Sequence, residues 1–403
     1  MVKRHKIAVL TEWSRAYGRG ALRGIARYVE AHRRWKVYQT ERGLCDAAPD
    51  WLQSWEGDGI IARIESDELL RQIQRLKLPA VDLFEHGRGG GFPGVITNNR
   101  TIAQMAADHL LDRRLEQFAY CGLPGVYSSE ARSKCFVEHL RERGFEVHVY
   151  TNPRQSDQHF ISTSEEFELR CEEAVATWIQ RLPKPIGLMA CNDLRAYQVL
   201  MVCGDLDIAV PEEVAVIGVD NDELICELCH PPLSSIEQNP ERAGYEAAAL
   251  LDRMLDGQPP PQEPTLIEPL GVVPRQSTDV VAVGDPDVAT AVRFIRAHAC
   301  DGIRVRDVLE HVRTSRSTLE RRFHKLLGRS PKDEILRVQL QQVKQLLSMT
   351  DHPLAKIAQL TGFSYMESMC ACFKRTFAQT PGQYRHEARA AGDASSHYQS
   401  PPR

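Results

Sequence analysis

The segment Val305-Arg-Asp-Val-Leu-Glu-His-Val312 recurs 49 residues further along the chain as Leu354-Ala-Lys-Ile-Ala-Gln-Leu-Thr361. In the first copy, apolar residues occupy the first, fourth, fifth and eighth positions, which lie on one face of a helix. Each copy is followed by a polar turn, a second helical pattern and a closing Ser-Pro or Thr-Pro pair. The repeat therefore predicts two units, each made of a short helix, a turn and a longer helix.

Residues typical of helix ends support this division. Ser315 stands where the longer helix of the first unit would begin, and serine is a common N-cap. Gly328 stands where that helix would end, and Ser330-Pro331 is typical of the start of another helix. We expect this connecting helix to run from Pro331 to about residue 348.

Helix, turn and helix units of this kind place their second helix in the major groove of DNA. Arginine can form two hydrogen bonds with guanine, glutamate can accept one from cytosine, and basic side chains can neutralise phosphates. In the first unit the candidate DNA-binding residues are Arg316, Ser317, Glu320, Arg321, Arg322 and Lys325. In the second unit they are Tyr365, Met366, Glu367, Cys370, Lys374 and Arg375. The expected partner is double-stranded DNA.

Charge is distributed unevenly along the chain. The net charge is −4, yet the residues from Asp285 onward contain 19 Lys and Arg against 12 Asp and Glu. The upstream residues contain the remaining 31 Lys and Arg and 42 Asp and Glu. A basic domain on an acidic body favours a nucleic-acid partner. The alternative is an all-helical interaction domain whose charges are only solvated.

Residues 286 to 388 resemble the DNA-binding domain of the AraC family, because two units, a connecting helix and the closing stretch 373–385 follow that family's spacing. The resemblance implies that both units contact successive major grooves on one face of the DNA. Arg313 stands where the family usually has a glycine in the first turn, so we expect a positive φ angle there. The second unit has few polar donors, so we expect base discrimination to depend more on the first unit.

The N-terminal 280 residues alternate short apolar runs with helical patterns. This alternation predicts an α/β fold of parallel sheets that are covered by helices on both faces. The predicted strands are Ile7–Leu10, Gly59–Ile61, Ala80–Leu83, Phe118–Cys121, Val147–Tyr150, Ile186–Ala190 and Val214–Val219. Sheets of this kind bind ligands at the carboxyl ends of their strands.

The same region resembles the ligand-binding core shared by LacI-type repressors and periplasmic sugar-binding proteins. The matching stretches are a strand followed by Asn192-Asp193, a strand followed by Asp220, and the residues around Arg132. The resemblance implies two α/β lobes that close around a sugar. It also implies that Arg132, Asn192 and Asp220 bond the sugar hydroxyl groups.

Four further candidates for ligand binding follow the first predicted strand, where an aromatic ring can stack on a sugar face. They are Glu12, Trp13, Ser14 and Tyr17. The alternative is that Asn192 and Asp220 only cap helices and that Trp13 packs in the core.

Changes in pattern along the chain predict four segments. Residues 1–278 form a two-lobed ligand-binding domain, 279–285 a linker, 286–390 the DNA-binding domain and 391–403 a disordered tail. This combination resembles regulators of xylose operons. The resemblance implies a homodimeric activator that responds to xylose or a related monosaccharide. It also implies that the DNA-binding domains are reoriented when the lobes close, and that the protein contacts RNA polymerase. The alternative is a regulator of the same architecture with a non-pentose ligand.

Other classes of protein fit the sequence less well. No apolar run approaches the roughly 20 residues that cross a bilayer, and no secretory signal is recognised, so we expect a cytoplasmic protein without a membrane partner. The glycines from Gly18 to Gly24 loosely resemble the dinucleotide loop of an NAD(P)-dependent enzyme, but they begin several residues after their strand. Neither a catalytic motif nor a metal or cofactor site is predicted.

Overall fold

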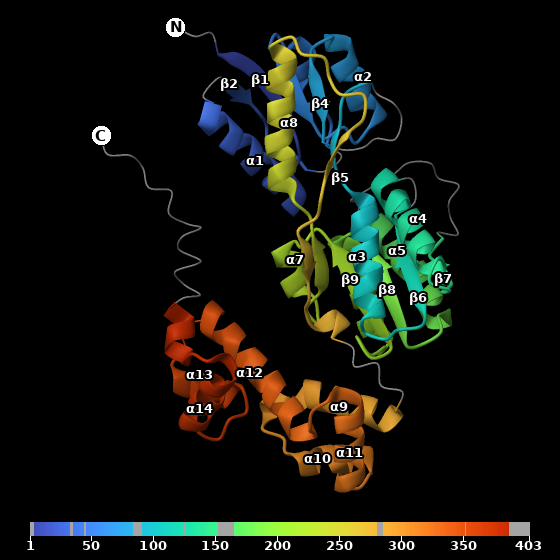
Figure 1. The fold of residues 1–403 in the computed structure, drawn as a ribbon, viewed down its shortest axis with the longest axis vertical. Helices are drawn as coiled ribbons and strands as arrows, with labels where there is room; N and C mark the ends of the chain where they lie inside the picture. Colours follow the sequence, from blue (N-terminus) through green and yellow to red (C-terminus); the bar gives the residue numbers. More distant parts are fainter. Residues whose placement is uncertain are drawn as a thin grey trace. The chain divides into compact units, whose positions relative to one another are not determined.

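The computed structural model divides into two compact units, Met1–Ala282 and Val283–Arg403 (Figure 1). It describes residues 4–32, 35–43, 46–83, 91–123, 126–151, 165–279, 285–350 and 352–386. The predicted tail, 391–403, and residues 280–284 of the predicted linker lie outside the described residues. Among the residues that are described, none of the helices is long and apolar enough to cross a membrane.

The first unit contains two α/β lobes (Figure 1). Lobe 1 is built on a parallel sheet with the strand order β2-β1-β3-β4. Its strands are β1 (His5–Leu10), β2 (Trp35–Tyr38), β3 (Gly59–Ala62) and β4 (Ala80–Asp82). Alternate residues of β1 point to opposite faces, so Ile7 and Val9 pack under α1 (Ala16–His32) and α8 (Pro240–Leu255). Ala8 and Leu10 pack on the other face with residues of α2 (Asp67–Leu76).

Glycines allow α1 and α8 to approach closely. A Cβ atom on Gly24 would lie 1.9 Å from the main-chain oxygen of Glu241, and one on Gly244 would lie 2.0 Å from that of Ala21. Real Cβ atoms do not come so close, so only glycine fits at this crossing. The glycines between Gly18 and Gly24 therefore belong to a packed helix rather than to a dinucleotide-binding loop.

Lobe 2 is built on a six-stranded sheet with the order β12-β10-β9-β8-β6-β7. Its strands are β6 (Phe118–Cys121), β7 (Val147–Val149), β8 (Ile186–Ala190), β9 (Val214–Val219), β10 (Ser234–Glu237) and β12 (Gly271–Val273). One face is covered by α3 (Asn99–Leu111) and α4 (Tyr127–Arg141), and the other by α5 (Glu165–Arg181), α6 (Asp193–Asp205) and α7 (Glu223–Leu228). The predicted parallel arrangement is confirmed except at β12, which runs antiparallel to β10.

The chain passes between the lobes three times. The first and third passages lie beside each other, because β5 (Val95–Thr97) pairs in parallel with β11 (Thr265–Ile267). The second passage joins β10 to α8 through Gln238 and Asn239. The two lobes are therefore joined by three short connections, and hinges of domain closure lie in connections of this kind.

The second unit is helical throughout its described residues, and its two predicted helix-turn-helix units are present (Figure 1). Its helices are α9 (Pro286–His298), α10 (Val305–Val312), α11 (Arg316–Leu327), α12 (Pro331–Met349), α13 (Leu354–Leu360) and α14 (Met366–Phe377). One core gathers around Phe323 of α11 and a second around Phe373 of α14, with α12 running from the first to the second. These two phenylalanines occupy matching positions in the sequence repeat.

The predicted helix ends of the first helix-turn-helix unit are confirmed. Ser315 is the N-cap of α11 and accepts a hydrogen bond from the main-chain nitrogen of Thr318 at 3.3 Å. Gly328 ends that helix with φ 65°, and Ser330 caps α12. Arg313 has φ 54° in the turn, as its replacement of the usual glycine predicts.

Candidate functional sites

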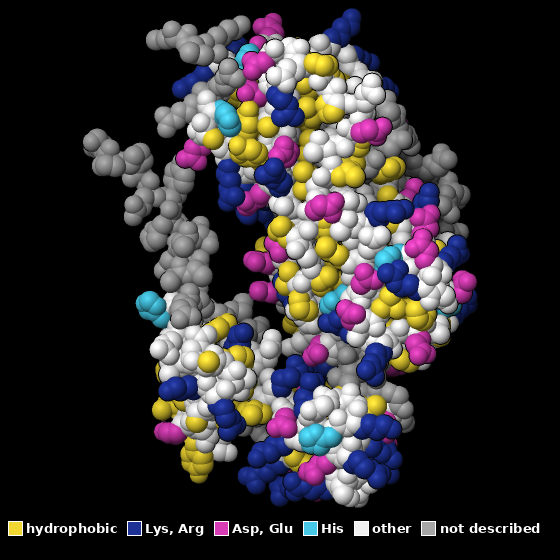
Figure 2. All heavy atoms as spheres, in the orientation of Figure 1, with side chains coloured by type: hydrophobic (Ala, Val, Ile, Leu, Met, Phe, Trp, Pro, Cys, Tyr) yellow, Lys and Arg dark blue, Asp and Glu magenta, His cyan; other side chains and the backbone are white. Residues whose placement is uncertain are grey.

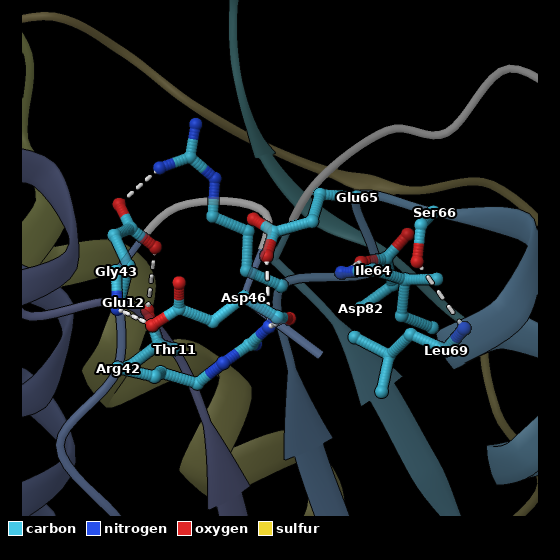
Figure 3. A network of polar contacts seen from close by, with 11 residues as sticks. Thr11, Glu12, Arg42, Gly43, Asp46, Ile64, Glu65, Ser66, Leu69 and Asp82 are labelled. Carbon is cyan, nitrogen blue, oxygen red and sulfur yellow. Dashed lines mark hydrogen bonds and ion pairs between the residues drawn. The ribbon is translucent and has the colours of Figure 1, made fainter. Parts of the chain in front are cut away.

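Charged and polar side chains gather where the strands of lobe 1 end (Figure 3). Glu12 follows β1, Arg42 follows β2 and Glu65 follows β3. Arg42 donates from Nη2 to a carboxylate oxygen of Glu65 at 3.0 Å, and both side chains are buried. Asp82, the last residue of β4, accepts a hydrogen bond from the main-chain nitrogen of Ile64 at 3.1 Å. This network orders the loops at one edge of the sheet.

Glu12 lies in an ion pair with Arg63 at this edge. Glu12 is fully buried, and the guanidinium of Arg63 also lies 5.2 Å from the centre of the Tyr17 ring. Burial raises the pKa of the Tyr17 hydroxyl, which stays protonated and can donate a hydrogen bond. Burial lowers the pKa of Arg63, but the carboxylates of Glu12 and Glu65 more than compensate, so the net shift is upward.

Trp13 and Ser14 follow Glu12 but have exposed side chains. Trp13 is 38% exposed, so it is not a core residue. Its main-chain nitrogen donates to the main-chain oxygen of Arg42 at 2.9 Å, which fixes the loop after β1. An exposed indole beside a polar network remains available for stacking.

Arg132 extends from α4 toward the edge of the lobe 2 sheet and is 6% exposed. Its Nε atom donates to Oδ1 of Asn99 at 2.9 Å, and its Nη1 atom donates to the main-chain oxygen of Cys191 at 2.5 Å. The guanidinium is therefore oriented by the start of α3 and by the end of β8.

Asp220 and Asn192 follow neighbouring strands, yet the structure gives them different local roles. Asn192 is the N-cap of α6 and accepts a hydrogen bond from the main-chain nitrogen of Arg195 at 2.8 Å. Asp220 does not cap a helix: it has φ 120°, and its carboxylate accepts a hydrogen bond from Gln238 in the hinge region. Burial, opposed by Arg132 and Arg63, raises the pKa of Asp220.

Five of these residues form a group that we call the interlobe cluster: Glu12, Tyr17, Arg63, Arg132 and Asp220. Its members interact electrostatically across the two lobes, Asp220 with Arg63 and Tyr17 with Arg132. The cluster contains two carboxyl groups and two guanidiniums, so its acidic and basic groups are equal in number. Lobe 2 also contacts lobe 1 through Asp222, which accepts hydrogen bonds from the main-chain nitrogen of Ala16 at 3.2 Å and from Arg19 at 3.3 Å.

Two members of this site were not predicted from the sequence. Arg63 follows β3 and Asp222 follows β9, so the rule that ligands lie at strand ends would have included both. Neither stood out among the 54 acidic and 50 basic residues of the chain, because their partners are distant in sequence. The contact of Asp222 with Arg19 joins residues 203 positions apart.

The first recognition helix, α11, exposes most of the residues predicted to bind DNA. The exposed side chains are Arg316, Ser317, Arg321 and Lys325. Arg316 also forms an ion pair with Glu320, at 2.9 Å. Figure 2 shows Lys and Arg side chains gathered over the part of the second unit that holds α10 and α11. Surface ion pairs one helical turn apart are weak, so the pair between Arg316 and Glu320 leaves both side chains available to DNA.

Arg322 has a different environment. It forms ion pairs with Asp287 at 2.7 Å and with Asp285 at 3.1 Å, which join α11 to the start of α9. The structure thus gives Arg322 two acidic partners within the protein.

The second recognition helix, α14, presents a less polar surface. Tyr365 is 69% exposed and Met366 36% exposed, and Glu367, Lys374 and Arg375 are also exposed. Cys370 is partly buried against the core of this unit. The expectation that base discrimination depends more on the first unit stays a prediction.

Three known protein families match successive parts of the chain. Residues 6–91 match an XylR N-terminal domain, residues 107–278 a periplasmic binding protein-like domain, and residues 308–387 a helix-turn-helix domain. The chain is therefore a transcription regulator that joins a periplasmic-binding-protein-like domain to an AraC-type DNA-binding domain.

Individual relatives cover nearly the whole chain. The xylose operon regulatory protein of Haemophilus influenzae is 32% identical over 394 residues, which are 94% of this chain and 98% of the relative. That of Escherichia coli K12 is 33% identical over 398 residues, 95% of this chain and 97% of the relative. A solved structure of the xylose-binding transcription activator xylR covers 96% of this chain and 99% of its own, with 31% identity and a TM-score of 0.80.

The chain belongs to the family of xylose operon regulatory proteins. This family consists of transcription regulators, so the alternative of an NAD(P)-dependent enzyme is wrong. The helix-turn-helix domain implies DNA binding, and the periplasmic-binding-protein-like domain implies a sugar ligand.

Proposed function

We propose that this protein is a transcription activator whose effector is an uncharged pentose, with D-xylose as the first candidate. The observation that carries the proposal is the interlobe cluster, in which charged and hydroxyl groups from both lobes, three of them buried and two half-buried, converge near strand ends. Carboxylate, guanidinium and phenol groups each bond sugar hydroxyls, and their fixed positions select one arrangement of those hydroxyls.

The balance of charge in the cluster supports a neutral ligand. A sugar phosphate or sugar acid would need cationic side chains without acidic partners, because a buried anion must be compensated. Here Arg63 is paired with Glu12, and Arg132 acts on Asp220. The proposed ligand-binding residues are Glu12, Trp13, Ser14, Tyr17, Arg63, Arg132, Asn192 and Asp220.

For DNA binding, we assign base contacts in the first unit to Arg316, Ser317, Glu320 and Arg321, and a phosphate contact to Lys325. Arg322 is assigned instead to holding α9 against α11, because of its two acidic partners. In the second unit, Tyr365, Met366, Glu367 and Cys370 face the bases, and Lys374 and Arg375 face phosphates. Apolar groups on this helix suit thymine methyl groups.

For regulation, we propose a homodimer that places two DNA-binding domains on neighbouring half-sites. The sugar binds the closed arrangement of the lobes more tightly than the open one, which shifts the population toward the closed arrangement. The closed form then places the DNA-binding domains where they bind the operator and contact RNA polymerase.

The test is a thermal-shift screen of the full-length protein against pentoses and hexoses, with a sugar phosphate and a sugar acid as charged comparisons. A ligand that binds only the folded state raises the melting temperature as its concentration increases. We expect D-xylose or a close pentose to raise it and the charged sugars to leave it unchanged. A shift with a hexose alone would favour the same architecture with a non-pentose effector.

A further inference from the structure

Four residues near the C-terminal end of the first unit are fixed by buried hydrogen bonds. We call Arg275–Thr278 the linker anchor, because residues 280–284 lead from it to the second unit. Ser277 and Thr278 are fully buried although both are polar. The Ser277 hydroxyl donates to the main-chain oxygen of Val216 in β9 at 2.6 Å. The main-chain nitrogen of Ser277 donates to the main-chain oxygen of Pro232 at 3.0 Å.

One chain of hydrogen bonds joins the anchor to α3. The guanidinium of Arg113 donates to Nδ1 of His109 at 3.1 Å, and a guanidinium has no acceptor. Burial and the nearby Arg113 charge lower the pKa of His109 to about 3, so its ring is neutral. The ring hydrogen therefore lies on Nε2, which donates to the hydroxyl of Thr278 at 2.8 Å.

The series of hydrogen bonds continues from Thr278 into the anchor, with each hydroxyl donating to the next acceptor. The Thr278 hydroxyl donates to the hydroxyl of Ser234 at 2.7 Å, which donates to the main-chain oxygen of Arg275 at 2.9 Å. Arg113 also donates from Nε to the main-chain oxygen of Thr278. Arg113 also donates from Nη1 to the main-chain oxygen of His109 at 2.8 Å, so a shift at this end of α3 would disturb several of these hydrogen bonds together.

The two ends of α3 belong to different sites. Its first residue, Asn99, orients Arg132 of the interlobe cluster, while His109 and Arg113 near its other end hold Thr278. Asn99 and His109 lie on the same 13-residue helix, and Arg113 follows its last residue, so a rigid displacement of α3 would move the contact with Arg132 and the contacts with Thr278 together.

A second, shorter connection leads to the other ligand-binding loop. The guanidinium of Arg275 donates from Nη2 to Oδ1 of Asn221 at 2.9 Å and from Nη1 to the main-chain oxygen of Leu233 at 3.0 Å. Asn221 directly follows Asp220 of the interlobe cluster and has φ 50°. The anchor is thus bonded to α3, whose first residue orients Arg132, and to the loop after β9 that carries Asp220.

We propose that Arg275 and Thr278 are positioning residues that couple occupancy of the interlobe site to the placement of the DNA-binding unit. The proposal rests on the proposed function, since it assumes that a sugar binds at the interlobe cluster. Neither residue touches the cluster, so both should act on the coupling between sugar and DNA rather than on either affinity alone. Such coupling is reciprocal and is measured as a ratio of dissociation constants.

The experiment uses the full-length protein, D-xylose, and a DNA duplex selected from random sequence by binding to the wild-type protein. The Kd for the duplex is measured with and without saturating D-xylose, and the Kd for D-xylose is measured by calorimetry. Thr278→Val keeps the shape of the side chain and removes only its hydroxyl. Arg275→Lys keeps the charge and loses the planar pair of donors. Arg253→Lys, at an exposed position of α8, is the matched control.

We expect the xylose-dependent ratio of duplex Kd values to fall at least about fivefold in Thr278→Val and Arg275→Lys, a size typical of allosteric coupling. The Kd for D-xylose alone and for DNA alone should change less than about threefold, and Arg253→Lys should match the wild type. Variants that retain the wild-type ratio would overturn the coupling role and leave the proposed function standing. A wild-type ratio of one would overturn the proposed function itself, and the coupling with it. If Arg275→Lys does not fold, Thr278→Val still decides between these outcomes.

Discussion

Arg132 donates its Nε hydrogen to Oδ1 of Asn99 at 2.9 Å, so the first residue of α3 fixes the direction of a buried guanidinium. The neighbouring residue, Asn98, caps α3 instead, because its side chain accepts a hydrogen bond from the main-chain nitrogen of Thr101 at 3.3 Å. Asn98 also donates from its side-chain amide to Glu268 at 2.7 Å, whereas only Asn99 contacts Arg132.

Asn99→Ala should weaken D-xylose binding and also lower stability, because Arg132 loses the acceptor that directs its guanidinium. A hydrogen bond to a charged group contributes about 1.5–3 kcal/mol, which sets an upper bound of roughly 10- to 150-fold on the change in Kd. Calorimetry gives the Kd, and urea unfolding gives the stability. Asn98→Ala is the control: loss of an N-cap costs about 0.5–2 kcal/mol of stability. Equal effects of the two variants on Kd would contradict the assignment.

Asp220→Ala should abolish the response to sugar and preserve DNA binding in the absence of sugar. Asp220 lies in the hinge-facing part of the interlobe cluster and interacts with guanidiniums from both lobes. The measurement is the duplex Kd with and without D-xylose. Asp205→Ala, at an exposed position near the end of α6, should respond as the wild type does. A normal response in Asp220→Ala would remove this residue from the ligand site.

Arg321→Ala should weaken binding to the selected duplex by about 1–3 kcal/mol if Arg321 contacts a base. Arg321 is exposed on α11, which makes it free to reach the major groove. Binding to random DNA should change much less, because phosphate contacts dominate that affinity. Arg293→Ala, on the exposed face of α9, is the control. Equal losses on selected and random DNA would instead indicate a phosphate contact.

Substitutions at two left-handed positions should change stability in opposite directions. Arg313 has φ 54°, where a residue with a Cβ atom is strained by roughly 1–2 kcal/mol, so Arg313→Gly should raise stability by up to about 1 kcal/mol. Gly328 has φ 65° with open space around it, so Gly328→Ala should lower stability by a similar amount. Urea unfolding of the full chain, monitored through its helical signal, tests both. A loss of stability in Arg313→Gly would show that the arginine side chain makes a compensating contact.

Stability should depend on pH through His109. Its pKa is about 3 in the folded protein and near 6.5 when unfolded, so the unfolded state binds more protons between these values. The stabilising contribution is complete above pH 6.5 and is lost as pH falls toward 3. At pH 5 the loss is about 2 kcal/mol. Unfolding free energies at pH 7 and pH 5 should therefore differ less in His109→Gln than in the wild type.

The control for this pH effect is His148→Gln, at an exposed position of β7. Burial raises the pKa of Asp193 and Asp220, which acts in the opposite direction in every variant. The comparison between variants removes that common contribution. An unchanged pH dependence in His109→Gln would mean that the pKa of His109 is not lowered in the folded protein. A protonated ring would still donate from Nε2 to Thr278 but could not accept from Arg113 at Nδ1.

Much of the secondary structure followed from local patterns. All seven predicted strands are present, because each of them except the edge strand β7 contains consecutive buried apolar residues. Five strands were not predicted, and four of them are passages between lobes or lie at the end of the six-stranded sheet: β5, β10, β11 and β12. With three or four residues and mixed polarity, they are recognisable only through the strands that pair with them.

The sequence by itself determined the helix-turn-helix pair, since apolar spacing, N-caps such as Ser315 and the stop at Gly328 act within a few residues along the chain. The tertiary structure alone decided which charged groups meet. Arg63 and Asp220 come from different lobes, and Arg275 reaches Asn221 across 54 residues. These relationships exist because the chain crosses between the lobes three times, so their geometry depends on the packing of whole sheets rather than on any local pattern.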